Sequence, residues 1–104
     1  MTEKENRFHQ EMVNIYKLNK QLLNYTPTRF LQMVNEYGGL QAAKKLLATS
    51  GGESGFLILW QKGRLDLSME ALVLKPEYHE LFTQTELDEA RKRLTDLGYL
   101  QGNQ

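Results

Sequence analysis

The sequence predicts an all-α domain, in which a long N-terminal helix precedes a compact cluster of five or six shorter helices. Apolar residues recur at spacings of three and four along most of the chain, which is the periodicity of amphipathic helices. Glycines, prolines and helix-capping residues separate these stretches. One apolar run, residues 56–60, could form a strand, but no second run of similar quality exists to pair with it. We therefore interpret it as a helix.

The composition is typical of one folded domain. The chain has 104 residues, of which 40% are hydrophobic and 25% are charged, and its 13 basic and 13 acidic residues give a formal net charge of zero. These values exclude a disordered polymer and argue against a strongly basic nucleic-acid binder. The absence of cysteine excludes a disulfide-stapled miniprotein and cysteine-ligated metal sites. We expect a single domain over residues 1–104.

No targeting or membrane segment is evident in the sequence. The longest apolar run is far shorter than the ~20 residues that cross a bilayer, and the N-terminal residues are polar and of mixed charge. We expect a cytoplasmic protein that does not enter a membrane.

The first helix is predicted over residues 5–24, after a frayed segment at residues 1–7. Its inward stripe is expected to contain Phe8, Met12 and Ile15, followed by Leu18 or Leu22 and then Tyr25. Polar residues are expected mostly on the opposite face, and these are Glu11, Asn14, Lys17, Asn19 and Lys20.

Local signals delimit the next two helices. Thr26 is a suitable N-cap and Pro27 suits the first helical position, so a helix is predicted to follow them. The glycines at positions 38 and 39 end it, because glycine accepts the left-handed geometry of a helix end. A third helix is predicted over residues 40–48, with Lys44 and Lys45 on its outer edge.

Residues 49–55 are rich in glycine and serine and predict a flexible connection, because they lack the lysine and preceding strand of a phosphate loop. Ser54 and Gly63 then bracket the apolar helix, and residues 65–68 are expected to be extended or turn-like. Short helices are predicted over residues 69–74 and 77–82. The last helix opens with a capping box formed by Thr83 and Glu86, or by Thr85 and Asp88, and Gly98 ends it. Residues 100–104 form a polar tail.

Fourteen residues on these stripes make up the predicted core: Phe30, Val34, Leu46, Leu47, Phe56, Leu59, Trp60, Leu72, Leu81, Phe82, Leu87, Ala90, Leu94 and Leu97.

The strongest candidates for catalysis are Asp66, Glu70 and His79. Two carboxylates could perform acid–base chemistry, yet charges bounded by leucines more often form ion pairs, and Arg64 is a nearby partner. Neither histidine, His9 nor His79, has the spacing of a metal site or a visible nucleophile. We therefore predict no catalytic residue, no metal ligand and no cofactor.

Basic residues offer an alternative function, because nucleic acids are bound through Lys and Arg. The candidates are Lys44, Lys45, Arg64, Arg91 and Arg93. Acidic residues four positions earlier, in the pairs Asp88–Lys92 and Glu89–Arg93, instead predict a solvated, self-paired face on the last helix.

The first helix has more apolar residues near its end than a small domain easily covers. The candidates for partner binding are Tyr16, Leu18, Leu22, Leu23 and Tyr25. The leading prediction is therefore a non-enzymatic, protein-binding or regulatory accessory module that acts through a helical surface. Its partner is another protein or a second copy of the chain, which would make it a homodimer.

Three segments also resemble a family of small uncharacterised bacterial helical proteins. They read Y-x-P-x-x-F from Tyr25, G-F-x-x-L-W-x-x-G-R-L-D-L-S-x-E-A-L from Gly55 and L-F-T-x-x-E-L from Leu81. The resemblance covers residues 25–99 and leaves out the first helix. It implies an accessory or recognition module without an assigned activity, found alone or attached to larger proteins.

Overall fold

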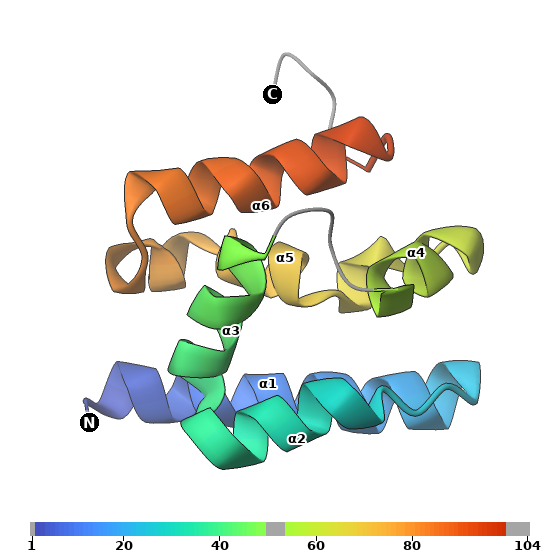
Figure 1. Cartoon of the computed structure of the whole chain (residues 1–104), viewed down its shortest axis with the longest axis horizontal. Helices are drawn as coiled ribbons and strands as arrows, with labels where there is room; N and C mark the ends of the chain where they lie inside the picture. The colour runs from blue at the N-terminus through green and yellow to red at the C-terminus, as the bar shows by residue number, and fades with distance from the viewer. Residues whose placement is uncertain (1, 50–53, 100–104) are drawn as a thin grey trace.

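The structure is a computed structural model that describes residues 2–49 and 54–99, and it confirms the all-α prediction (Figure 1). The described elements are α1 (Glu3–Leu23), α2 (Thr28–Tyr37), α3 (Gly39–Ala48), α4 (Ser54–Gln61), the 3₁₀ helix η1 (Leu65–Leu67), α5 (Met69–Val73), the 3₁₀ helix η2 (Pro76–Leu81) and α6 (Gln84–Asp96). Most of the predicted connection at residues 49–55 and the predicted tail at residues 100–104 lie outside the described residues.

The helices form three tiers (Figure 1). α1 and α2 pack together in the first tier, and α6 forms the third. The short elements α4, η1, α5 and η2 lie between them. α3 connects the tiers, because it contacts α1, α2 and α6. This arrangement places the C-terminal ends of α1 and α6 at the same end of the molecule as α4.

Capping residues define several helix boundaries. Thr2 and Glu5 form a capping box, so α1 begins at Glu3 and the fraying expected of residues 1–7 is wrong for residues 2–7, whereas Met1 lies outside the described residues. Thr83 and Glu86 form the second box, as predicted, and Ser68 caps α5 by accepting a hydrogen bond from the Ala71 N–H at 3.1 Å. The cap predicted at Thr26 is wrong, because Pro27 occupies the N-cap position of α2 and provides no side-chain hydrogen bond.

The α2–α3 junction depends on its two glycines. Gly38 has a φ of 84°, which a side chain would strain. A Cβ on Gly39 would lie 2.6 Å from the Cα of His9, and the Gly39 N–H donates to His9 Nδ1 at 2.8 Å. Glycine therefore allows α3 to approach α1 closely, and His9 has a structural partner there.

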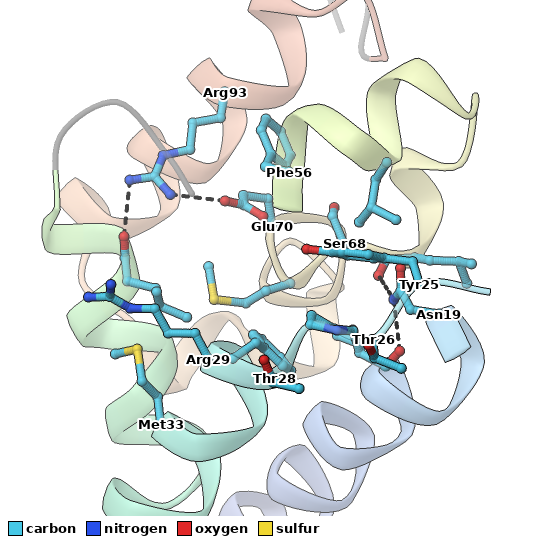
Figure 2. A pocket seen from close by; sticks show the side chains of 17 residues that line it. Asn19, Tyr25, Thr26, Thr28, Arg29, Met33, Phe56, Ser68, Glu70 and Arg93 are labelled. Atoms are coloured by element: carbon cyan, nitrogen blue, oxygen red, sulfur yellow. Dashed lines mark hydrogen bonds and ion pairs between the residues drawn. The ribbon is translucent and has the colours of Figure 1, made fainter. Parts of the chain in front are cut away.

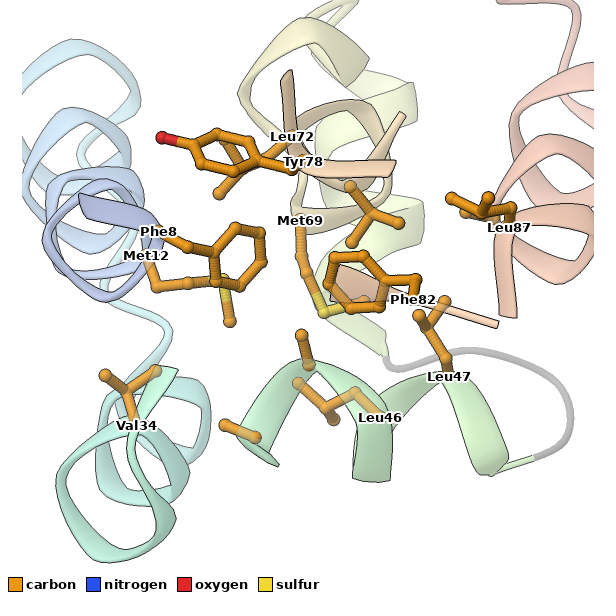
Figure 3. Packing of buried hydrophobic residues seen from close by; sticks show 14 residues of the cluster. Phe8, Met12, Val34, Leu46, Leu47, Met69, Leu72, Tyr78, Phe82 and Leu87 are labelled. Atoms are coloured by element: carbon orange, nitrogen blue, oxygen red, sulfur yellow. The ribbon is translucent and has the colours of Figure 1, made fainter. Parts of the chain in front are cut away.

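The main core lies between α1, α3, α5 and η2 (Figure 3). Phe8 and Met12 of α1 are fully buried and face this core. The Phe8 ring meets the edges of the Tyr78 and Phe82 rings, with centroid distances of 5.2 and 5.4 Å. The hydroxyl of Tyr78 donates to the Glu11 carboxylate, so the ring can be buried without an unpaired polar atom.

A second, smaller core lies around α4. Its buried members are Phe56, Leu59, Leu65 and Leu94, and Leu23 and Leu97 pack against it. Ten of the fourteen predicted core residues are buried, whereas Phe30, Leu81 and Leu97 are only partly buried. The prediction for Trp60 is wrong, because 46% of its surface is exposed. α4 is apolar on every side, and Phe56 and Leu59 occupy its inner face.

The inward stripe of α1 also differs from the prediction. After Phe8, Met12 and Ile15, the next inward residue is Asn19, which is 1% exposed, whereas Leu22 is 52% exposed. The expectation that Asn19 lies on the polar face is therefore wrong. Spacings of four, three and four continue the stripe to position 19 regardless of the residue type found there.

Candidate functional site

The three candidate catalytic residues do not share a site. Asp66 is bound by Arg64, at 3.0 and 3.1 Å, and the hydrogen bond from Arg64 lowers the pKa of Asp66. Glu70 pairs with Arg93, and His79 Nε2 lies 2.8 Å from the carbonyl oxygen of Leu74. The structural interpretation of Arg64 and Asp66 as an ion pair is confirmed. Across residues 2–49 and 54–99, no group of three potential metal ligands is present.

Arg93 is the residue whose position differs most from the predicted solvated face. It is 8% exposed, and its Nε donates to Glu89 at 2.7 Å while Nη1 donates to Glu70 at 2.9 Å. Nη2 lies within hydrogen-bond distance of the carbonyl oxygens at the C-terminal end of α3, those of Leu46, Leu47 and Thr49. Arg93 therefore joins α6 to α5 and α3, and its donors are occupied within the protein.

Glu70, the partner of Arg93, is also buried, at 5% exposure. Burial raises the pKa of this carboxyl, and the hydrogen bond from Arg93 opposes the increase. The ion pair between the buried Glu70 carboxylate and Arg93 links α5 to α6. This pair therefore has a structural role that the sequence did not reveal.

The other candidates for nucleic-acid contact are mostly paired with acidic residues. Lys44 binds Glu86 at 2.8 Å, Arg64 binds Asp66, and Arg91 lies 3.7 Å from Asp88. Lys45 is exposed and its Nζ lies 4.6 Å from the centre of the Tyr37 ring. The predicted Glu89–Arg93 pair forms, whereas Lys92 pairs with Asp96 instead of Asp88. Of the five candidates, Lys45 is thus the one without an acidic partner among the described residues.

The predicted partner surface on α1 is largely covered. Leu22 is exposed, whereas Tyr16, Leu18, Leu23 and Tyr25 are only partly accessible. Leu23 packs against the core around α4. The apolar excess that the sequence assigned to the first helix is therefore mostly used inside the molecule.

The strongest exposed apolar feature is on α4. Leu57 and Trp60 are 49% and 46% exposed, and their spacing of three places them on one side of the helix. We call these two residues the α4 surface. Leu22, near the C-terminal end of α1, and Tyr99, after α6, are also exposed. The C-terminal ends of α1 and α6 lie at the same end of the molecule as α4 (Figure 1). No charged residue lies between Phe56 and Gln61, so the α4 surface is uncharged.

A pocket of about 260 Å³ adjoins the opposite side of α4 (Figure 2). α4 contributes Phe56 and Leu59 to its lining, and the rest comes from α1, the α1–α2 connection, α2, α3, η1, α5 and α6. Glu70 lines the pocket, but Asp66 and His79 do not. The enzyme hypothesis built on these three residues therefore has no common cleft among the described residues.

Comparisons with protein-family models, with curated proteins and with solved structures find no match to the chain. The resemblance of residues 25–99 to a family of small bacterial proteins stays a prediction. Within the described part of the chain, no helix has both the length and the apolarity that a membrane span requires.

Proposed function

We propose that the protein is a protein-binding accessory module that associates through the α4 surface, and that its partner is a second copy of the chain. The observation that carries this proposal is the pair of large apolar side chains, Leu57 and Trp60, exposed side by side on one helix. Isolated apolar residues are common on protein surfaces, whereas adjacent ones with a tryptophan among them are typical of interface centres.

The choice of a second copy as the partner rests on charge. A two-fold interface between identical chains brings residues near the symmetry axis close to their own counterparts, so charged residues at that point repel one another. The α4 surface contains no such residue, and the formal net charge of the chain is zero. Packing α4 against α4 would bury both Trp60 side chains without a like-charge contact.

The oligomeric state tests the proposal. Sedimentation equilibrium over a wide concentration range should show a monomer–dimer equilibrium for the unmodified chain. Trp60→Ser should weaken dimerisation by roughly tenfold or more, because a central tryptophan contributes a large share of interface energy. A chain that stays monomeric at every concentration would refute the proposal.

Tyr37→Ser provides a matched control. Tyr37 is exposed to a similar degree, 43%, but lies at the end of α2, away from α4. We expect this variant to dimerise like the unmodified chain. Equal weakening by both substitutions would mean that association does not depend on the α4 surface. Nucleic-acid binding, the alternative predicted from the sequence, stays a prediction.

A further inference from the structure

The pocket beside α4 contains a buried acceptor that nothing in the described residues satisfies. Asn19 is 1% exposed and lines the pocket, and its Oδ1 has no hydrogen-bond partner. Buried polar atoms are paired in the great majority of cases, so an unpaired one inside a pocket indicates a donor supplied by solvent or by a ligand. Figure 2 shows Asn19 at the pocket, where its nitrogen is held by two hydrogen bonds.

The orientation of the Asn19 amide is fixed by its surroundings. Nδ2 donates to the Ile15 carbonyl oxygen at 2.8 Å and lies 3.4 Å from the Leu67 carbonyl oxygen. Exchanging the amide nitrogen and oxygen would place Oδ1 against these two oxygens, and neither has a proton to donate. The oxygen must therefore be the unpaired atom, and what the site lacks is an N–H or O–H group.

The rest of the lining is mostly apolar. Its apolar side chains come from α1, α2, α3, α4, η1 and α5, among them Ile15, Phe30, Met33, Phe56, Leu59 and Met69. The buried charged pair at one wall is already satisfied, because Arg93 donates to Glu70, Glu89 and the Thr49 carbonyl. The third charged residue of the lining, Arg29, is exposed to solvent. A ligand in the interior gains little from a charge and most from an apolar body.

From this arrangement we infer that the pocket binds a small, neutral, largely apolar molecule that donates one hydrogen bond to Asn19. The volume sets the size of the ligand. A cavity of about 150 Å³ holds a benzene molecule, so 260 Å³ accommodates about ten non-hydrogen atoms. An aromatic bicycle with one N–H group fits this description. This site is separate from the α4 surface, since its lining includes neither Leu57 nor Trp60.

Two probes of nearly the same shape test the inference on the unmodified protein. Indole carries an N–H donor, and benzothiophene replaces it with sulfur. Titrations followed by ¹H–¹⁵N and methyl NMR should show both probes shifting the signals of residues that line the pocket, including the side-chain amide of Asn19. We expect indole to bind roughly tenfold more tightly, because only indole pairs the buried oxygen.

Variants then test separately the contribution of the Asn19 hydrogen-bond acceptor and that of the pocket volume. Asn19→Leu removes the acceptor and should bring the two affinities close together. Met33→Trp should fill the pocket and weaken the binding of both probes roughly tenfold or more. Tyr37→Ala, at a position outside the pocket lining, should change neither affinity. Equal binding of the two probes to the unmodified chain would overturn the inference, as would shifts confined to other residues or the absence of any shift. The probe comparison needs no variant, so a failure of Asn19→Leu to fold leaves it decisive.

Discussion

The core around Phe8 and the core around Phe56 are built from similar side chains but differ in how completely they are enclosed. Phe8, Met12, Val34 and Tyr78 are all fully buried, and aromatic edges and an ion-paired surface close that end of the molecule. Around Phe56, the same fold leaves a pocket on one side of α4 and exposed apolar residues on the other. The closed end contributes stability, while the open end contains the two surfaces for which we propose binding.

The largest difference should appear when each core loses its phenylalanine. Phe8→Ala should lower the free energy of unfolding by about 4 kcal/mol, within the range for a fully buried aromatic residue. Phe56→Ala should cost clearly less, because its ring already borders an unfilled pocket. Urea denaturation of both variants measures the two values. Equal losses would show that the two ends are equally well packed.

Arg93 tests the connection between the two ends. Arg93→Met leaves Glu70 buried without its cation and removes the donors from the α3 carbonyls, so we expect a loss of about 3 kcal/mol. The loss should be smaller at low pH, where Glu70 is protonated. Arg91→Met, an exposed position on the same helix, should change stability by less than about 0.5 kcal/mol. A similar effect of both substitutions would contradict the claim that Arg93 links α6 to α5 and α3.

The smallest of these effects should come from Glu86, which ties α6 to α3 through Lys44 at 2.8 Å. Burial opposes the ionisation of Glu86, but hydrogen bonds from Lys44 and the Thr83 N–H outweigh it and lower its pKa from 4.5. Because the folded state favours the carboxylate, this stabilisation is present above pH 4.5 and is lost as the pH falls through the folded-state pKa.

Glu86→Gln should therefore cost about 1 kcal/mol at neutral pH, and its stability should approach that of the unmodified chain in acid. Thermal unfolding over a pH series measures this convergence. Glu36→Gln, an exposed position on α2, should follow the unmodified chain throughout. A constant deficit at all pH values would contradict the assignment.

The sequence was sufficient to predict the α-helices, because caps, glycines and apolar spacing act locally. It could not identify the outer face of α4, since residues 56–60 are all apolar and only tertiary packing decides which side turns inward. Asn19 was misplaced because the stripe was traced by residue type, although the spacing from Phe8, Met12 and Ile15 pointed to it. The Arg93 interactions bring together groups from α3, α5 and α6, and no local sequence pattern predicts contacts between helices that are far apart in the chain.

α4 is an eight-residue helix whose two sides have different neighbours, with Phe56 and Leu59 toward the pocket and Leu57 and Trp60 toward solvent. The proposed ligand site and the proposed dimer surface thus lie on opposite sides of one short helix. A small molecule that shifts α4 would alter the affinity of a second copy for the α4 surface, and by thermodynamic reciprocity association would alter the affinity of the small molecule by the same factor.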